Sequence, residues 1–369
     1  MDETTARPLS AIVLAAGHGT RMRSERPKPL HVLVGKPMVV WVLDALADCD
    51  VGRVSVVVGH GGDEVRKRLA EDAGDRPLAF VEQSVQRGTG DAAAVGLTGL
   101  GDDGWDEPED VLLLTADTPL LRPDTIASLV DMHRSADAAC TVLTAVFDDP
   151  TGYGRIVRGR DEWVERIVEQ ADATPEEDAI AEINTGIFCV RRGLLAPALR
   201  RLQPDNAQGE YYLTDIVEVL AETGHRVISM AADDPGETHG INDRVQLASA
   251  EGELRRRINL DWMRRGVTLV DPDRTHLDAT VTLEHDVTLY PGTMLQGRCT
   301  IGAGADIGPD THLVDTTVGA AARVVQASAV KATIGDGASV GPWAALGPGD
   351  DVAPGAVTGP HYAGQNAAR

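Results

Sequence analysis

The stretch Leu14-Ala-Ala-Gly-His-Gly-Thr-Arg-Met22 decides the fold of the first part of this chain. It continues the apolar run 11–14, which predicts a buried strand that ends at the glycines. A loop containing Gly17 and Gly19 directly after a strand allows backbone N–H groups to close around a chain of phosphates. The spacing lacks the third glycine of the dinucleotide-binding fingerprint, and no Gly-Lys-Ser/Thr follows as in a Walker A loop. The sequence therefore predicts a phosphate-binding loop of neither of these kinds.

Positive charges follow at once. Arg21 lies within the loop, and Lys28 lies in the segment Arg26-Pro-Lys-Pro-Leu-His31, so both are candidates for fixed contacts to phosphate. Residues 21–36 contain five basic side chains against the single acid Glu25, although the whole chain has a net charge of −23. A basic segment in an acidic protein attracts a small polyanionic substrate. The alternative is a solvated surface loop.

Length and composition narrow the remaining possibilities. A chain of 369 residues predicts two domains. The negative net charge argues against nucleic acid as the principal partner, because a phosphate backbone requires a basic face. No apolar run approaches the roughly 18 residues of a membrane span, and residues 1–5 show no secretory pattern. Four scattered cysteines lack paired or metal-ligand spacing, so we expect reduced thiols in a cytoplasmic protein.

Apolar runs that alternate with helical patterns indicate the fold class. Predicted helices over 37–46 and 63–69 lie among predicted strands at 11–14, 54–58, 111–114, 141–146 and 187–190. This alternation predicts a doubly wound, Rossmann-like α/β domain with ligands beyond the carboxyl ends of its strands. Asp117 comes just after one such strand, where an unpaired carboxylate would be costly, and is a candidate metal ligand. A helix N-cap is the alternative for this residue.

After residue 266 the period of the sequence changes to six. Leucine, isoleucine or valine recurs at 277, 283, 289, 295, 301, 307 and 313, then at 318, 324 and 330, then at 334, 340, 346 and 352. Small or β-branched residues mostly stand two positions earlier, at 281, 287, 293, 299, 305 and 311. A parallel β-helix built from hexapeptides has this period. With about 18 residues per triangular coil, as in left-handed β-helices, the stretch predicts roughly four to five coils.

Together these motifs resemble the sugar-1-phosphate nucleotidylyltransferases, and above all the bifunctional N-acetylglucosamine-1-phosphate uridylyltransferase/glucosamine-1-phosphate acetyltransferase family. The resemblance follows the family's order from residue 11 to about residue 250. Its further blocks are Val58-Gly-His-Gly-Gly62, Gln83 with Gly88-Thr-Gly90, Asp117-Thr-Pro-Leu120, Gly152-Tyr-Gly-Arg155, Ile167-Val-Glu-Gln170, Glu182-Ile-Asn-Thr-Gly186, Asn206-Ala-Gln-Gly-Glu210 and Gly240-Ile-Asn-Asp243. The resemblance implies an enzyme that converts UTP and N-acetylglucosamine 1-phosphate to UDP-N-acetylglucosamine and pyrophosphate.

The pattern along the sequence divides the chain into four parts. We expect a nucleotidyltransferase domain over 1–243, a helical linker arm over 244–266, a short left-handed β-helix over 267–352 and a poorly ordered tail over 353–369. Because such β-helices commonly assemble side by side, we expect a homotrimer.

Roles for individual residues follow from the same resemblance. Arg21 and Lys28 hold the triphosphate as catalytic residues, and Asp117 with Asn242 holds Mg²⁺. The nucleotide-binding residues are Leu14, Ala15, Gly17, Gly19, Gln83, Gly88 and Thr89. The sugar-binding residues are Gly154, Glu169 and Asn184. Thr185 is a further candidate for the sugar pocket.

Three positions depart from the family pattern. Asp91 stands where a His usually follows Gly-Thr-Gly, and Ala116 stands where a Gly usually precedes the metal-binding Asp. These departures leave open another base or another sugar 1-phosphate. Gly347 replaces the Arg of a Leu-Arg-Pro-Gly segment that contacts substrate phosphate, and the sequence stops before the other acetyltransferase motifs. We therefore expect no acetyltransferase activity.

A function of a different class is a non-catalytic sugar-nucleotide sensor, or a scaffold that assembles through the β-helix. The presence of Arg21 and Lys28 together with the metal pair argues against it, because a protein that only binds has little need of metal ligands. We assign no role to His18.

Overall fold

The computed structural model describes residues 7–74, 76–101, 109–159 and 161–367. The chain divides into two compact units, the first formed by Met1–His31 with Pro37–Gln246 and the second by Val32–Lys36 with Leu247–Arg369. Residues 1–5, considered above for a secretory pattern, lie outside the described residues. Among the described residues, none of the helices combines the length and the apolarity that crossing a membrane requires.

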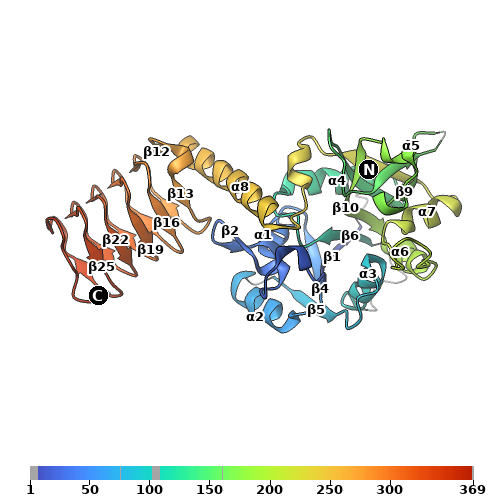
Figure 1. Ribbon diagram of the computed structural model, residues 1–369, viewed down its shortest axis with the longest axis horizontal. Coiled ribbons are helices and arrows are strands. Elements are labelled where there is room, and N and C mark those ends of the chain that lie inside the picture. The colour runs from blue at the N-terminus through green and yellow to red at the C-terminus, as the bar shows by residue number, and fades with distance from the viewer. Residues whose placement is uncertain (1–6, 75, 102–108, 160, 368–369) are drawn as a thin grey trace, which may run out of the picture. The chain divides into compact units, whose positions relative to one another are not determined.

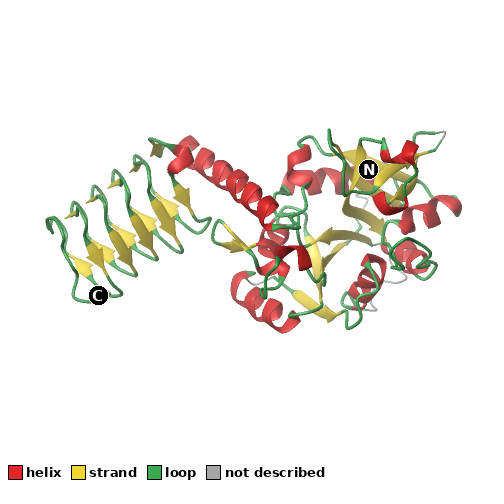
Figure 2. Ribbon diagram, in the orientation of Figure 1, coloured by secondary structure: helices red, strands yellow, loops and turns green. Residues whose placement is uncertain are grey.

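A nine-stranded, mostly parallel sheet forms the centre of the first unit (Figures 1 and 2). Its main path has the order β11-β7-β10-β6-β1-β4-β5, β8 and β9 extend it beside β10, and β10 runs antiparallel to both β6 and β7. The strands are β1 (Leu9–Ala15), β4 (Val51–Val58), β5 (Leu78–Glu82), β6 (Asp110–Thr115), β7 (Cys140–Val146), β8 (Arg155–Arg158), β9 (Val164–Val168), β10 (Glu182–Arg191) and β11 (Val227–Ala231). The short strands β2 (Val32–Leu33) and β3 (Lys36–Pro37) form a separate pair.

Helices cover both faces of this sheet, which confirms the predicted doubly wound fold. In β1, Ala11 and Val13 pack into one apolar cluster and Ile12 into another, because successive side chains of a strand point to opposite faces. Both clusters are apolar because parallel strands are covered on both sides. The helices are α1 (Met38–Asp44), α2 (Gly62–Asp72), α3 (Thr89–Thr98), α4 (Pro123–Ser135), α5 (Pro175–Asp178), α6 (Arg192–Leu199) and α7 (Asp215–Glu222). Two 3-10 turns, η1 (Thr20–Met22) and η2 (Lys28–Leu30), follow β1.

The second unit is a left-handed β-helix that follows the long helix α8 (Arg244–Arg264). Its short strands form three five-stranded parallel sheets, in which each strand pairs with the third strand after it (Figure 1). The strands are β12 (Thr268–Leu269), β13 (His276–Leu277), β14 (Thr282–Leu283), β15 (Thr288–Leu289), β16 (Met294–Gln296), β17 (Thr300–Ile301), β18 (Asp306–Ile307), β19 (His312–Val314), β20 (Thr317–Val318), β21 (Arg323–Val324), β22 (Ser328–Val330), β23 (Thr333–Ile334), β24 (Ser339–Val340), β25 (Ala345–Leu346) and β26 (Asp351–Val352). Ile258 and Trp262 of α8 pack against the apolar interior of the coils.

The interior of the β-helix matches the predicted six-residue period except at one position. Ala329 is buried, with 1% of its surface exposed, and it pairs with Leu313 on one side and Leu346 on the other. Val330, which the period placed inside, is 36% exposed, so that prediction is wrong. The buried positions Val324, Ala329 and Ile334 are five residues apart in each step, where the expected frame had a step of six followed by one of four.

Residues after Val352 also differ from the expectation of a poorly ordered tail. Val357 bridges Ser339 and Ala363 bridges Ala345, both in the parallel sense of the coils before them. The Ala345 amide donates to the Tyr362 carbonyl at 2.8 Å. Glycine and proline suit the tight turns of such a coil, so a composition without apolar repeats still continues the β-helix here. Residues 368 and 369 lie outside the described part.

Candidate active site

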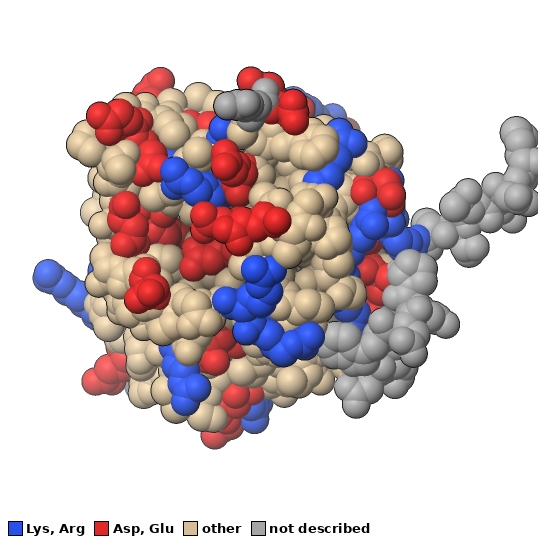
Figure 3. All heavy atoms as spheres, turned by 90° about the vertical axis from the view of Figure 1, so that its right-hand side faces the viewer, with Lys and Arg blue, Asp and Glu red and all other residues tan. Residues whose placement is uncertain are grey.

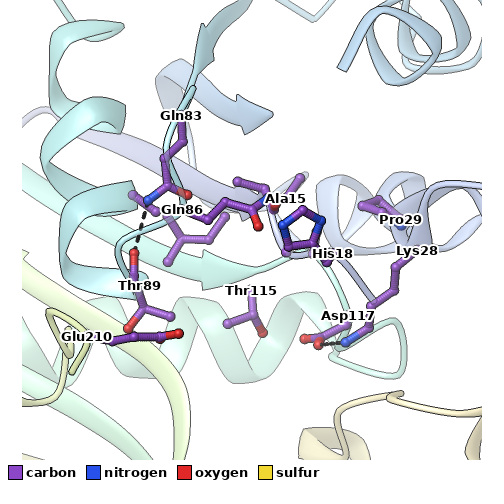
Figure 4. A pocket seen from close by; sticks show the side chains of 16 residues that line it. Ala15, His18, Lys28, Pro29, Gln83, Gln86, Thr89, Thr115, Asp117 and Glu210 are labelled. Atoms are coloured by element: carbon purple, nitrogen blue, oxygen red, sulfur yellow. Dashed lines mark hydrogen bonds and ion pairs between the residues drawn. The ribbon is translucent and has the colours of Figure 1, made fainter. Parts of the chain in front are cut away.

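A pocket of about 330 Å³ lies at the carboxyl ends of β1 and β6, where the doubly wound fold predicts a ligand (Figure 4). It is lined by Leu14, Ala15, Ala16, Gly17, His18, Lys28, Pro29, Gln83, Gln86, Gly88, Thr89, Ala92, Thr115, Ala116, Asp117 and Glu210. Eight of the residues that we singled out in the sequence are therefore together: Leu14, Ala15, Gly17, Lys28, Gln83, Gly88, Thr89 and Asp117.

The glycine loop packs directly on the stem of Lys28. Gly19 has φ 58°, a left-handed conformation that side chains rarely adopt, and a Cβ atom there would lie 2.7 Å from the Cβ of Lys28. Nothing lies within 4 Å of the place a Cβ would take on Gly17. The loop is therefore tight where it supports the lysine and open at Gly17, which lines the pocket.

The ammonium group of Lys28 joins the two candidate metal ligands. Its Nζ is 2.5 Å from Asp117 Oδ2 and 3.0 Å from Asn242 Oδ1, and Arg21 donates to the same Asn242 oxygen at 2.9 Å. The side chains of Lys28 and Asp117 are 14% and 26% exposed, so the pair is partly shielded from water. The Ile241 amide donates to the Asp117 carbonyl at 2.9 Å, and this backbone bond brings Asn242 beside β6.

The start of helix α4 excludes the alternative role of Asp117 as a helix N-cap. Helix α4 begins at Pro123 with Arg122 as its N-cap, so Asp117 caps no helix.

A second part of the pocket combines a buried amide with closely approaching backbone. Gln83 is 5% exposed, and its Nε2 donates to Gly88 O at 3.1 Å and to Asp91 Oδ2 at 2.8 Å. Gly88 has φ 112°, and a Cβ there would lie 2.5 Å from the Tyr211 carbonyl oxygen, so only glycine fits. The Thr89 hydroxyl accepts from the Leu213 amide at 2.9 Å.

The three expected sugar-binding residues form a separate cluster. The backbone N–H of Asn184 donates to the Gly154 carbonyl at 2.8 Å. A Cβ on Gly154 would lie 3.4 Å from Glu169 Oε1. Burial raises the pKa of the Glu169 carboxyl, and the hydrogen bond from the Thr214 hydroxyl opposes that shift. The Thr185 hydroxyl donates to Leu143 O inside the sheet, at 2.7 Å.

The cluster lies next to the pocket. A Cβ on Gly186, which directly follows Thr185, would be 3.2 Å from the methyl group of Thr115, a pocket residue. The Gly186 amide donates to Asn184 Oδ1 at 3.0 Å. Strand β10 thus brings the Glu169 cluster beside the end of β6.

Comparison with known proteins identifies the family. A MobA-like NTP transferase domain matches residues 11–227. The bifunctional protein GlmU of Caldanaerobacter subterraneus subsp. tengcongensis is 42% identical over 336 residues, which are 91% of this chain and 71% of the relative. The chain belongs to the GlmU family. The GlmU of Mycobacterium sp. (strain KMS) is 46% identical over 347 residues, 92% of this chain and 68% of the relative.

A solved structure shows the same fold as this GlmU-family chain. The crystal structure of UDP-glucose pyrophosphorylase complexed with UDP-glucose superimposes with a TM-score of 0.55 and 16% identity. The match covers 68% of this chain and 99% of the pyrophosphorylase chain. This likeness concerns the fold alone.

Sequence reasoning missed several pocket residues of this GlmU-family chain. His18, which received no role, lines the pocket, and Glu210 lies beside Thr89 (Figure 4). Gln86 donates from Nε2 to the Ala16 carbonyl and so connects the segment 83–89 to the end of β1. Both Gln86 and Glu210 lie next to or within blocks that resemble the GlmU family, and that proximity was the signal that could have found them.

Two of the three departures from the GlmU-family pattern belong to this region: Ala116 lines the pocket, and Asp91 contacts the pocket residue Gln83. Ala116 is buried and its amide donates to the Leu14 carbonyl at 3.0 Å, while Asp91 accepts from Gln83. On the face of the molecule shown in Figure 3, acidic and basic side chains are interspersed.

Proposed function

We propose that this pocket transfers a uridylyl group from UTP to N-acetylglucosamine 1-phosphate, with release of pyrophosphate and UDP-N-acetylglucosamine. The observation that carries this proposal is the meeting of Lys28, Asp117 and Asn242 in a GlmU-family chain, in a pocket that also contains the buried amide of Gln83. Sugar-1-phosphate nucleotidylyl transfer is the reaction class of this family.

The chemistry demands alignment more than covalent help. A phosphate monoester has a second pKa of about 6, so a sugar 1-phosphate is a nucleophile near neutral pH. Its oxygen attacks the α-phosphorus of UTP, a new P–O bond forms, and the bond to pyrophosphate breaks. Lys28 and Arg21 offset the mutual repulsion of the two polyanions and the charge that develops on the leaving group.

The donor set fits a divalent cation. Asp117 Oδ2 and Asn242 Oδ1 both lie within 3.0 Å of one ammonium nitrogen, so two hard oxygen donors already converge on a single positive charge. Mg²⁺ takes one or two such protein ligands and completes its shell with phosphate oxygens and water. When bound, Mg²⁺ neutralises charge on the reacting phosphates. Asp117 and Asn242 are the residues that would hold it, and Lys28 is then available to the phosphates.

The Glu169 cluster is proposed as the sugar site. The Glu169 carboxylate accepts hydrogen bonds from sugar hydroxyl groups, while the backbone at Gly154 allows the sugar to approach closely. Its place beside Thr115 supports this proposal, because the acceptor phosphate must reach the pocket from there.

Two further proposals concern the second unit. The β-helix assembles the protein as a homotrimer, which sedimentation velocity would detect as a threefold mass. The chain does not transfer acetyl groups, because a Cβ on Gly347 would lie 1.7 Å from Asn366 O and no side chain fits there to contact a substrate phosphate. Release of coenzyme A from acetyl-coenzyme A in the presence of glucosamine 1-phosphate would contradict the second proposal.

Pyrophosphate release from UTP and N-acetylglucosamine 1-phosphate, with and without Mg²⁺, tests the main proposal. Turnover should require the metal and should fall by orders of magnitude in Asp117→Ala. The matched control is Asp131→Ala, an exposed acid on α4, which should retain activity. If turnover occurs only with another triphosphate or another sugar phosphate, the proposed substrate pair is wrong. If no pair is turned over, the result favours a non-catalytic scaffold.

A further inference from the structure

Two acceptors hold the side-chain amide of Gln83 on the same side. Nε2 donates to the Asp91 carboxylate at 2.8 Å and to the Gly88 carbonyl at 3.1 Å, so both of its N–H groups are used. Gln83 is buried, and no described residue donates to its Oε1. Figure 4 shows the amide nitrogen of Gln83 on the side of Thr89 and its oxygen on the opposite side of the amide group.

This arrangement fixes which end of the amide faces a ligand. A carbonyl oxygen and an ionised carboxylate accept hydrogen bonds and donate none. If the Gln83 amide were flipped, its oxygen would face the Gly88 carbonyl and the Asp91 carboxylate, with no hydrogen atom between these acceptors. Buried acceptors without a donor cost free energy of folding, so the flipped amide is disfavoured. The Gly88 carbonyl accepts one of the two hydrogen bonds, at 3.1 Å. Asp91 accepts the other over the shorter distance of 2.8 Å.

We propose that Asp91 is a positioning residue that sets the base specificity of the pocket, because it orients Gln83 to present an acceptor. Uracil has an N–H donor at N3, whereas cytosine has an acceptor there, so an oriented Oε1 pairs with the first and opposes the second. The inference rests on the proposed function, in which this segment binds the base of the triphosphate. It gives the departure at position 91 a function in substrate choice.

A purely structural role for Asp91 leads to a different expectation. The residue is the third of helix α3, and a negative charge in the first turn of a helix is stabilising by itself. In the structure, however, its Oδ2 accepts from Gln83. A helix-stabilising charge changes stability without changing the choice between bases, so the two roles are separable by measurement.

The test is a double-mutant cycle read as a specificity ratio. The kcat/KM values for UTP and CTP, each with N-acetylglucosamine 1-phosphate, are measured for the wild type, Asp91→Ala, Gln83→Ala and the double variant. The UTP-to-CTP ratio should fall by about tenfold or more in Asp91→Ala. In the Gln83→Ala background the same change at Asp91 should leave the ratio unaltered, because Asp91 acts through the amide.

Two more variants sharpen the result. Asp91→Asn keeps the shape of the side chain but adds an N–H group that donates a hydrogen bond to the oxygen of a flipped Gln83 amide, so the UTP-to-CTP ratio should also fall. Asp63→Ala is the matched control, since Asp63 is likewise an acid in the first turn of a helix, α2, and its side chain is fully exposed. It should lower the melting temperature slightly and leave the ratio unchanged.

The outcomes distinguish this inference from the proposed function. If the wild type turns over UTP and the ratio is unchanged in Asp91→Ala, Asp91 only stabilises α3 and the inference is overturned. If the wild type does not turn over UTP, the proposed function fails. The inference is then decided by titration calorimetry of UTP and CTP binding to the same four proteins, where an equal preference in the wild type and Asp91→Ala overturns it.

Discussion

The β-helix and the pocket of the first unit differ in where their residues come from. In the β-helix, neighbouring interior positions such as Leu289 and Leu295 are six residues apart, fully buried, and packed within one continuous apolar interior. In the pocket, Lys28 comes from a turn after β1, Gln83 follows β5 and Asp117 follows β6. A repeated pattern thus supplies stability in one unit, and irregular connections between strands supply the chemistry in the other. Substitutions in the two regions should accordingly affect different quantities.

The largest effect is expected on activity, at Lys28. Lys28→Ala removes the positive charge that meets Asp117 and Asn242, and we expect kcat/KM for pyrophosphate release to fall by about 10³-fold. Lys67→Ala, which removes an exposed lysine of α2, is the control and should change kcat/KM less than twofold, about the scatter of such measurements. Similar losses in both variants would show that general charge, and not position, matters.

A comparable substitution in the β-helix should affect stability instead. Leu313 is fully buried, and Leu313→Ala should lower the local free energy of unfolding by about 3 kcal/mol through lost burial and the cavity left behind. Hydrogen exchange of the amides in residues 288–330 measures this change, and kcat/KM should be retained. His312→Ala, at the adjacent exposed position, is the control. Loss of activity in Leu313→Ala alone would break the proposed separation of roles.

The same contrast explains what the sequence could predict. The six-residue period identified nearly all interior positions of the β-helix, because each position repeats the same environment. It failed at Val330, because the interior position there is filled by the small Ala329, which a pattern of leucine, isoleucine and valine does not pick out. The strand–helix alternation likewise predicted the doubly wound domain, because each apolar run is buried on both faces.

The site was less accessible to sequence reasoning. Residues alone favoured Lys28 and Asp117, but Asn242 would have been a turn residue, and only the family resemblance joined it to them. Their meeting depends on the backbone bond between Ile241 and Asp117, which no local pattern indicates. The contact of Asp91 with Gln83 depends in the same way on how residues 83–88 fold back onto α3.

A smaller effect is expected at the end of the β-helix. A Cβ on Gly347 would lie 1.7 Å from Asn366 O, so Gly347→Ala must displace the last coil, at a cost of about 1–3 kcal/mol. Faster hydrogen exchange at residues 357–366 would report it. Gly252→Ala on α8 is the opposite case, because its nearest neighbour would be 3.9 Å away and alanine favours a helix by about 1 kcal/mol. Equal behaviour of the two variants would contradict the packing that we describe around Gly347.

The smallest effect concerns pH and returns to the first unit. Burial, with Glu218, Glu169 and Asp172 nearby, raises the pKa of Asp215 to about 6. Because the folded state holds this proton more tightly than the unfolded state, the associated stability is present below about pH 4 and is lost as the pH rises through about 6. Asp215→Asn should therefore match the wild type near pH 4 and exceed it by about 1–2 kcal/mol at pH 7.5, as measured by urea unfolding. A difference that stays constant across this range, as expected for the exposed control Asp131→Asn, would show that the charge on Asp215 does not oppose folding.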